Sequence, residues 1–324
     1  MRSYDVFNGD ADGICALHQL RLADPVDSEL VTGLKRDIEL LKAVPAERGD
    51  VVTVLDVSLD RNRAALAALL ERGVRVRYFD HHRAGAVPVH PGLEAVIDES
   101  DATCTSALVD RHLLGRFRAW AVVGAFGDNL RALANTLAAP LALSPDALDG
   151  LSELGASINY NAYGASEADV LYPPAALYRI VRGYADPLEM ARREPAAERL
   201  AVRRRADLAN ALAIPPVRSG RAADAYVLPD AAWSRRVSGT FANRLATDDP
   251  RRAHAVLTPH ADGAFTVSVR APRGCAPSAA EFCGRYGLGG GRVAAGGIER
   301  LDRARLDAFL DDLERTWEAV SSAE

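Results

Sequence analysis

Short clusters of aspartate and histidine are the residues of this sequence best suited to chemistry. Each cluster follows an apolar run: Asn8, Asp10 and Asp12 come after "SYDVF", Asp56 comes after "VVTVL", and Asp80, His81 and His82 come after "VRVRYF". A further acid, Asp128 in "GAFGDN", follows an apolar stretch with helical spacing. Taken alone, an aspartate after a strand is usually a turn residue or a helix cap. Their recurrence in order is what indicates a shared site.

Crowded carboxylates repel one another and raise each other's pKa, so such a cluster needs a cation. Oxygen donors together with imidazole suit Mn²⁺, Mg²⁺ or Co²⁺ better than a metal that prefers thiolates. Two such ions about 3.5–4 Å apart can share a bridging carboxylate, activate water at neutral pH and neutralise charge on a phosphoryl group. The clusters therefore predict metal-dependent phosphoryl chemistry.

Strand-like and helix-like segments alternate through the first half of the chain, and they can bring these clusters together. For example, "DVVTVLDVS" has the β-branched run of a buried strand, and "RNRAALAALLERG" is a helical segment that ends at Gly73. This alternation predicts βαβ units and a mostly parallel sheet. Because the carboxyl ends of parallel strands meet at one edge, we expect the clusters to converge there, where strand order reverses.

The length of 324 residues predicts two domains. A charged, alanine-rich helix is expected from Pro187 to Ala213, and "IPPVRSGRAAD" (214–224) has the prolines and small polar residues of a linker. The expected fold is α/β. It comprises a parallel-sheet domain at 1–190 with helices on both faces, a helical connector and linker at 191–223, and a smaller α/β domain at 224–324.

Composition excludes several classes of protein. A net charge of −5 argues against a protein that coats nucleic acid through an overall positive field. The four cysteines form neither a CxxC pair nor a zinc-binding series with histidine. The N-terminus lacks an apolar segment of signal-peptide length, and no run approaches the ~20 apolar residues that span a bilayer. We therefore expect a cytoplasmic protein without a membrane partner.

Four motifs in this sequence resemble, in order, those of the DHH phosphoesterase superfamily: "FNGDADG", "LDVS", "FDHH" and "GAFGDN". "VSVRAP" followed by "GLGGGRVAAGG" resembles the C-terminal DHH-associated domain that usually accompanies them. The superfamily includes RecJ-type exonucleases, oligoribonucleases, nucleoside bisphosphate phosphatases and cyclic dinucleotide phosphodiesterases. The resemblance implies a DHH domain linked by a helix to a smaller DHH-associated domain.

The resemblance also implies roles for individual residues. The first metal ion would be held by Asp10 and Asp56, and the second by Asp12, Asp56, His81 and Asp128, with Asp56 as the bridge. His82 would face the substrate phosphate or the bridging water, and Asp80 would orient a histidine. Substrate would be bound in the second domain by Arg270, Gly289, Gly290, Gly291 and Arg292.

Two positions depart from the family pattern. Asn8 stands where the family commonly has histidine or aspartate, and its uncharged amide oxygen is a weaker ligand for a hard cation. Arg292 stands where the glycine loop usually ends in histidine, and arginine can bind phosphate but not titrate near neutrality.

The expected function is hydrolysis of a phosphate ester in a short oligonucleotide or small nucleotide. The expected cofactors are two divalent ions, manganese in the first place with magnesium or cobalt as alternatives. A homodimer is possible. Because of Asn8 and Arg292, a second hypothesis stays open, namely a non-catalytic nucleotide-binding or regulatory protein that retains the fold.

Overall fold

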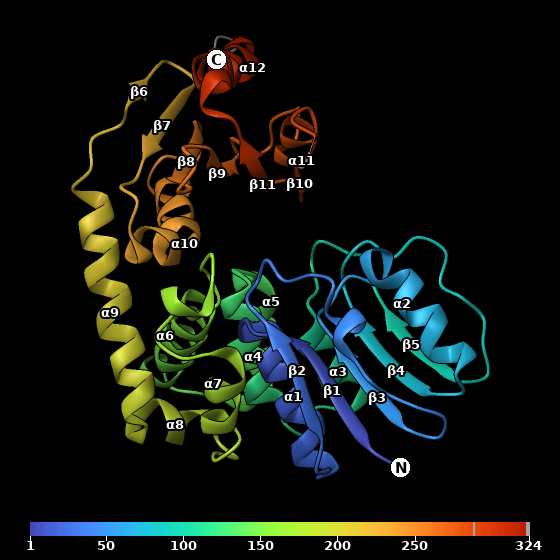
Figure 1. Cartoon of the computed structure of the whole chain (residues 1–324). Coiled ribbons are helices and arrows are strands. Elements are labelled where there is room, and N and C mark those ends of the chain that lie inside the picture. The colour runs from blue at the N-terminus through green and yellow to red at the C-terminus, as the bar shows by residue number, and fades with distance from the viewer. Residues whose placement is uncertain (288, 322–324) are drawn as a thin grey trace. The chain divides into compact units, whose positions relative to one another are not determined.

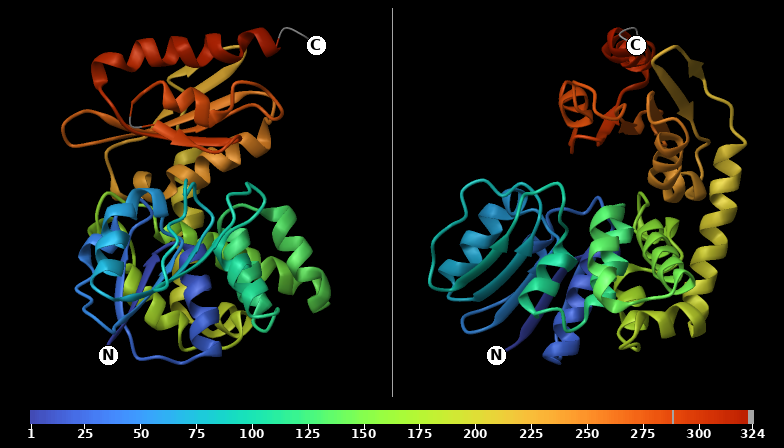
Figure 2. Two further views of the ribbon diagram at one scale, coloured as in Figure 1. Left: turned by 90° about the vertical axis from the view of Figure 1, so that its right-hand side faces the viewer. Right: turned by 180° about the vertical axis from the view of Figure 1, so that it is seen from behind.

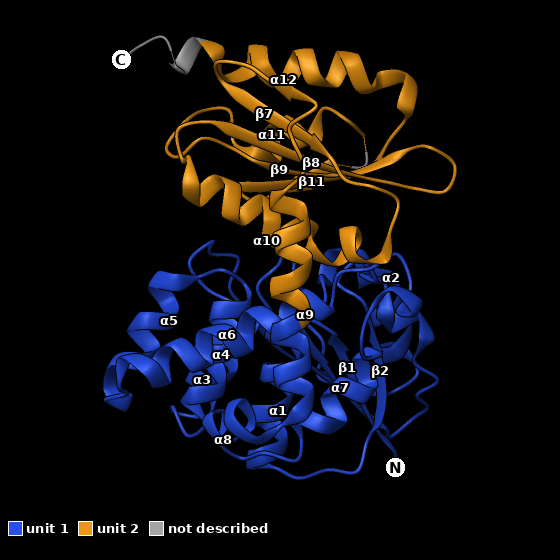
Figure 3. Ribbon diagram, turned by 90° about the vertical axis from the view of Figure 1, so that its left-hand side faces the viewer, with its two compact units in different colours: residues 1–202 blue, residues 203–324 orange. Residues whose placement is uncertain are grey.

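The computed structural model describes residues 1–287 and 289–321, without the side chains of 319–321. The chain forms two compact units, unit 1 at Met1–Val202 and unit 2 at Arg203–Glu324 (Figure 3). Helix α9 (Pro195–Leu212) runs through this division. Leu288, part of the glycine-rich string, lies outside the described residues. The domain boundaries expected from sequence, 1–190, 191–223 and 224–324, remain a prediction.

Unit 1 is built around a parallel sheet of five strands in the order β2-β1-β3-β4-β5 (Figure 1). The strands are β1 (Ser3–Asn8), β2 (Glu29–Gly33), β3 (Val51–Leu55), β4 (Arg75–Asp80) and β5 (Leu93–Ile97). The order reverses at β1, because the chain passes first to β2 on one side and then to β3 on the other. The expected parallel sheet is confirmed, and its switch point lies where β1 and β3 end.

Helices cover both faces of this sheet because its strand residues alternate between two hydrophobic cores. Val6 packs with Leu66 of α2 (Leu59–Glu71), whereas the next residue, Phe7, packs in the core that contains Ile14 of α1 (Ala11–Ala23). The remaining helices of unit 1 are α3 (Thr105–His112), α4 (Arg118–Gly127), α5 (Arg131–Ala138), α6 (Pro145–Asn161), α7 (Pro174–Val181) and α8 (Pro187–Arg193) (Figure 2).

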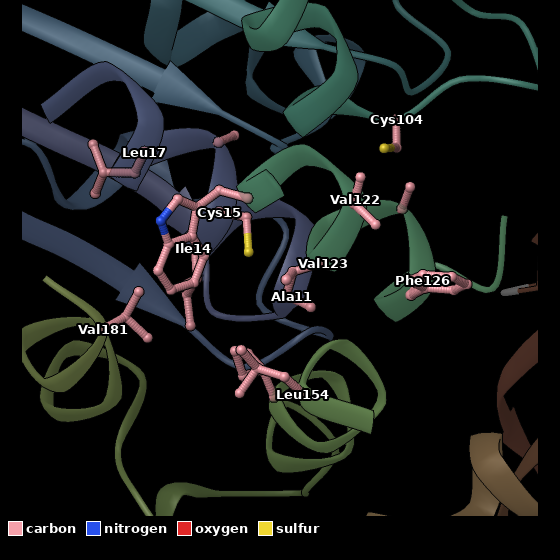
Figure 4. Packing of buried hydrophobic residues seen from close by; sticks show 14 of the residues in the cluster. Ala11, Ile14, Cys15, Leu17, Cys104, Val122, Val123, Phe126, Leu154 and Val181 are labelled. Atoms are coloured by element: carbon pink, nitrogen blue, oxygen red, sulfur yellow. The ribbon is translucent and has the colours of Figure 1, made fainter. Parts of the chain in front are cut away.

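The core on the α1 side fixes the helices that carry the site. Ile14 and Cys15 of α1 pack near Val122 and Val123 of α4, with Leu154 of α6 completing the contact (Figure 4). All five are buried. Burying a large apolar side chain contributes about 1.5–3 kcal/mol to the free energy of folding. These contacts therefore fix the position of α1.

Several elements differ from the sequence expectation. The structure contains a short 3₁₀ turn, Leu40–Ala43, and strand β5 (Leu93–Ile97), neither of which was predicted. Three helices, α3, α4 and α5, follow β5 in the chain. The helix expected from Pro187 to Ala213 breaks at Glu194, because Pro195 cannot continue the hydrogen-bond ladder of α8 and instead starts α9.

Unit 2 contains a mixed sheet of six strands in the order β10-β11-β9-β8-β7-β6. The strands are β6 (Arg218–Ser219), β7 (Ala223–Val227), β8 (Ala253–Pro259), β9 (Phe265–Arg270), β10 (Gly289–Gly291) and β11 (Ala295–Leu301). β7 and β8 run parallel, and the other neighbours are antiparallel. The segment expected as a linker thus contains β6 and the start of β7.

Helices also cover both faces of this second sheet. Val256 packs with Phe241 of α10 (Ala232–Asp248), whereas its neighbour Leu257 packs in the core of α11 (Ala279–Gly284) and α12 (Leu306–Ser321). Unit 2 is therefore an α/β unit with its own core. Within the described part of the chain, no helix combines the length and apolarity that crossing a membrane requires.

Candidate metal centre

The turn after β1 is organised by hydrogen bonds between its own residues. The side chain of Asp10 caps α1, with Oδ1 accepting from the backbone N–H of Asp12 at 3.0 Å and of Gly13 at 3.1 Å. The side-chain oxygen of Asn8 accepts from the backbone N–H of Asp10 at 3.1 Å. The first motif is thus a helix N-terminus as well as a source of ligands.

Asp12 is directed at the start of another helix. Its Oδ2 accepts from the backbone N–H of Thr105 at 2.7 Å, and its Oδ1 accepts from that of Ser106 at 2.8 Å. Both amides belong to the first turn of α3, where the helix dipole favours a negative charge. The fully buried carboxylate is therefore fixed in orientation.

Asp56 and His81 come from the ends of neighbouring strands. Asp56 follows β3 with a left-handed φ of 58°, a conformation that aspartate adopts more readily than most residues. Thr105 Oγ1 donates to Asp56 Oδ1 at 3.3 Å. His81 follows β4, and its Nδ1 lies 2.9 Å from the carbonyl oxygen of Thr103. Since that carbonyl can only accept, Nδ1 carries a proton, and Nε2 is the atom available to a metal.

Three carboxylates converge on Nε2 of His81. The distances from Nε2 are 3.3 Å to Asp56 Oδ1, 3.7 Å to Asp128 Oδ2 and 3.9 Å to Asp12 Oδ2. With metal–ligand bonds of about 2.1 Å, neighbouring ligands of an octahedral ion lie about 3.0 Å apart and opposite ones about 4.2 Å. Two overlapping groups of donors could each hold an ion, Asp12 with His81 and Asp128, and Asp56 with His81 and His82. Their oxygen and imidazole chemistry suits manganese or magnesium.

His82 lies beside this centre and is oriented by Asp80. Its Nδ1 donates to Asp80 Oδ1 at 2.7 Å, and Asp80 Oδ2 accepts from the backbone N–H of Leu59 at the start of α2. The His82 ring meets the ring of His81 edge-on, with centroids 4.7 Å apart. Its side chain is 40% exposed, whereas that of His81 is 2% exposed. Of the two histidines, His82 is the one that solvent can reach.

The electrostatics of the centre demand positive charge. Burial, followed by the charges of Asp10 and Asp12, raises the pKa of Asp56 well above its usual value. Burial alone would lower the pKa of His81, but the hydrogen bond and charge of Asp56, helped by Asp128, raise it to about 10. Without metal, the protonated imidazole therefore balances the acids. A divalent ion would displace the proton from Nε2 of His81, because a metal binds only the neutral form of this nitrogen.

Lys35 is a site residue that the sequence analysis missed. It lies just after β2, and its Nζ contacts Asp10 Oδ2 and lies 3.3 Å from Asp128 Oδ1. Burial would lower the pKa of Lys35, but Asp10 and Asp128 raise it well above its usual value, so the side chain is an ammonium ion. A signal existed, because Lys35 follows a strand as the acids do. Thr103, Thr105 and Ser106 were also missed, and their carbonyl and amide contacts have no sequence signature.

The residues expected to bind substrate lie in unit 2. Arg270, at the end of β9, donates from Nε to Asn243 Oδ1 at 2.7 Å. Gly289–Gly291 form β10, which pairs with β11, and the backbone N–H of Arg292 donates to the carbonyl of Ala295 at 2.8 Å. The sheet register pairs Ala295 with Arg270, so Arg270 and the glycine hairpin are neighbours. All the candidate metal ligands, in contrast, lie in unit 1.

No protein-family model matches the sequence, and neither does any curated protein. Solved structures do match. Exonuclease RecJ bound to manganese is 19% identical with a TM-score of 0.55, covering 100% of this chain and 90% of that one. RecJ from Thermus thermophilus, in complex with Mn²⁺, is 23% identical with a TM-score of 0.58, and this chain spans 52% of its length. The pGpG-specific phosphodiesterase PggH from Vibrio cholerae is 12% identical with a TM-score of 0.53, covering 98% of this chain and 100% of that one.

The protein shares the fold of these RecJ and PggH structures. The likeness extends over both units, since each match covers at least 98% of the chain. In this fold, the first three motifs fall at the carboxyl edge of the parallel sheet, around the switch point. The fourth brings Asp128 to them from the end of α4.

Proposed function

We propose that this protein is a metal-dependent phosphoesterase that hydrolyses a phosphate ester of a short oligonucleotide or a small nucleotide. The observation that carries the proposal is the convergence of Asp12, Asp56 and Asp128 on Nε2 of His81. The fold supports it, because the similar structures include two of RecJ, both with manganese, and one of a phosphodiesterase.

The resident ion would be held by Asp12, Asp56, Asp128 and His81, with manganese the first choice and magnesium or cobalt as alternatives. When bound, a divalent ion lowers the pKa of water and neutralises charge that develops on the phosphoryl group. The hydrogen bonds from Thr105 and Ser106 to Asp12, and from His81 to Thr103, keep these ligands from rotating away.

Other residues of the chain would bind and orient the substrate. In its imidazolium form, His82 would donate from Nε2 to a phosphate oxygen, because Nδ1 already donates to Asp80. Arg292 and Arg270 supply permanent positive charge for a second phosphate or the terminal nucleotide, and a guanidinium can bind a phosphate through two hydrogen bonds. A small, charged nucleotide meets these demands better than a long strand, because base stacking needs aromatic side chains and only 6% of the residues are aromatic.

One observation favours a second function, nucleotide binding without hydrolysis. Asn8 brings no charge to the first motif, and Lys35 contacts Asp10 and Asp128 at a place where the superfamily resemblance implies a metal ion. A protein that had lost an essential ion in this way would bind nucleotides and leave them intact.

The test is a hydrolysis screen on protein stripped of metal and reloaded with Mn²⁺. The panel comprises dinucleotides, nucleoside 3′,5′-bisphosphates, cyclic dinucleotides and pyrophosphate. We expect turnover of at least one nucleotide, and its loss in His81→Ala. The control is His112→Ala, because His112 is exposed and lies outside the candidate ligand set. Nucleotide binding with metal present, but without turnover of any compound, would establish the second function and refute the first.

A further inference from the structure

The ammonium group of Lys35 occupies a position that a metal ion could otherwise take. Its Nζ contacts Oδ2 of Asp10 and lies 3.3 Å from Oδ1 of Asp128. Asp128 has its other oxygen, Oδ2, on the side of His81, 3.7 Å from Nε2. The two oxygens of Asp128 therefore face two different groups, Lys35 on one side and His81 on the other. A carboxylate that bridges two metal ions has the same arrangement.

The fold holds Lys35 in this position. The backbone N–H of Lys35 donates to the carbonyl of Ala162 at 3.1 Å, and that of the preceding residue, Leu34, donates to Asp37 Oδ2 at 2.8 Å. The ring of Tyr163 lies 5.8 Å from Nζ, within the range of a cation–π contact. The Lys35 side chain is only 32% exposed. These contacts make Lys35 a fixed part of the site.

The donors on the Lys35 side are poor ones for a second metal. The Asn8 side chain is neutral, and its oxygen already accepts the backbone N–H of Asp10. Oδ1 of Asp10 accepts two further amides at the start of α1, and Oδ2 contacts Lys35. A dication here would lack the carboxylate or imidazole that Asn8 replaces, and it would have to displace an ammonium ion that already balances Asp10.

The choice of lysine is informative in this chain. Only two of its 39 basic residues are lysine, Lys35 and Lys42, and all the others are arginine. An ammonium is a compact point charge with donors in several directions, whereas a guanidinium is planar and larger. Of the two, the ammonium is closer in size and symmetry to a hydrated metal ion.

We propose that Lys35 replaces the first metal ion of the site, so that the protein works with one divalent ion at Asp12, Asp56, His81 and Asp128. Lys35 supplies the second positive charge and contacts a phosphoryl oxygen of the substrate. This inference rests on the proposed function only in that a divalent ion is taken to bind at His81.

The test counts bound ions directly. Wild-type protein, Lys35→Met and Lys42→Met are stripped of metal and titrated with Mn²⁺, with the free ion measured by electron paramagnetic resonance. Lys42 is the matched control because it is exposed and pairs with Glu39 on the surface. We expect one ion in the wild type and in Lys42→Met. Lys35→Met should bind two, the second more weakly because Asn8 remains.

Two results would overturn the inference: two ions of similar affinity in the wild type, or a single ion in a folded Lys35→Met. The wild-type count stands even where that variant fails to fold. Lys35→Arg keeps the charge and should bind one ion. Hydrolysis by the same samples separates this inference from the proposed function. Turnover with two ions in the wild type would refute only the role of Lys35, whereas the expected counts without turnover would refute only the enzyme.

Discussion

Single residues of the centre owe their orientation to a second contact. His81 is fixed by the carbonyl of Thr103, Asp12 by the amides of α3, and His82 by Asp80. Such partners hold a ligand or a substrate-facing group in the one rotamer that the chemistry requires. Changing a partner should therefore alter function with little effect on the metal itself.

Asp80→Asn provides a test at this scale. The amide keeps the size of the carboxylate but loses the charge that holds Nδ1–H of His82. We expect kcat to fall about 10- to 100-fold, the usual effect of losing such a partner, while the manganese stoichiometry stays unchanged. Steady-state kinetics and a metal titration measure the two quantities. Asp60→Asn, an exposed residue in the first turn of α2, should leave both unchanged. An unaltered kcat in Asp80→Asn would show that the hydrogen bond from His82 to Asp80 does not contribute to activity.

At the scale of elements, the sequence allowed much of the first sheet to be predicted. Runs of β-branched residues such as "VVTVL" predicted β3, and the acids after them were expected at one edge because parallel strands end on the same side. Asp56 and His81 indeed lie 3.3 Å apart, although 25 positions separate them in the chain.

The order of the strands could not be predicted from the sequence, and the contacts of Lys35 depend on it. Lys35 reaches Asp10 because β2 pairs with β1, on the side opposite β3. Residue spacing does not encode this neighbour relationship. Strand β5, "LEAVI", was missed because it is a half-buried edge strand without a long apolar run. The break between α8 and α9 could have been predicted, because Pro195 cannot lie within a regular helix. It was missed because the residues on both sides have helical periodicity.

The glycines of β10 have different surroundings, and this allows packing to be separated from binding. A Cβ added to Gly289 would lie 2.0 Å from the carbonyl oxygen of Cys283 in α11, whereas one added to Gly290 would meet no atom within 4 Å. Gly289 therefore serves the close contact of β10 with α11. Gly290 has free space where a Cβ would lie, so a ligand could approach its backbone closely.

We expect Gly289→Ala to lower the free energy of unfolding by roughly 1–3 kcal/mol, the usual cost of forcing extra atoms into a packed contact. Gly290→Ala should leave stability unchanged and raise KM for the nucleotide, because a methyl group keeps phosphate away from the backbone. Denaturant unfolding and steady-state kinetics test the pair. An unchanged KM in Gly290→Ala would show that this hairpin serves packing alone.

At the scale of the whole molecule, metal binding should act on one of the two units. The proposed ligands Asp12, Asp56, His81 and Asp128 all lie in unit 1, and each unit has hydrophobic cores of its own. We expect calorimetry to show two unfolding transitions, with Mn²⁺ shifting only one. At a hundred times the dissociation constant, the stabilisation is about 2.7 kcal/mol, or roughly 5–11 °C for a unit of this size.

His81→Ala is the control for this measurement, because it removes the central ligand and should abolish the shift. The unfolding transition of unit 2, measured in the same sample, is the internal reference because Mn²⁺ should not shift it. A manganese shift of equal size in both transitions would contradict the assignment of the ligands to unit 1 alone.

Helix α9 has a consequence for how the chain acquires its structure during synthesis. Ala197 and Leu200, in its first half, are buried in the core of unit 1, while Leu208 and Ala211, in its second half, pack against α10 of unit 2. A nascent chain that has just emerged as far as α8 still lacks the side chains that close its first core. A fragment cut at that point would expose an apolar surface. The ribosome must deliver the first half of α9 before unit 1 can finish folding.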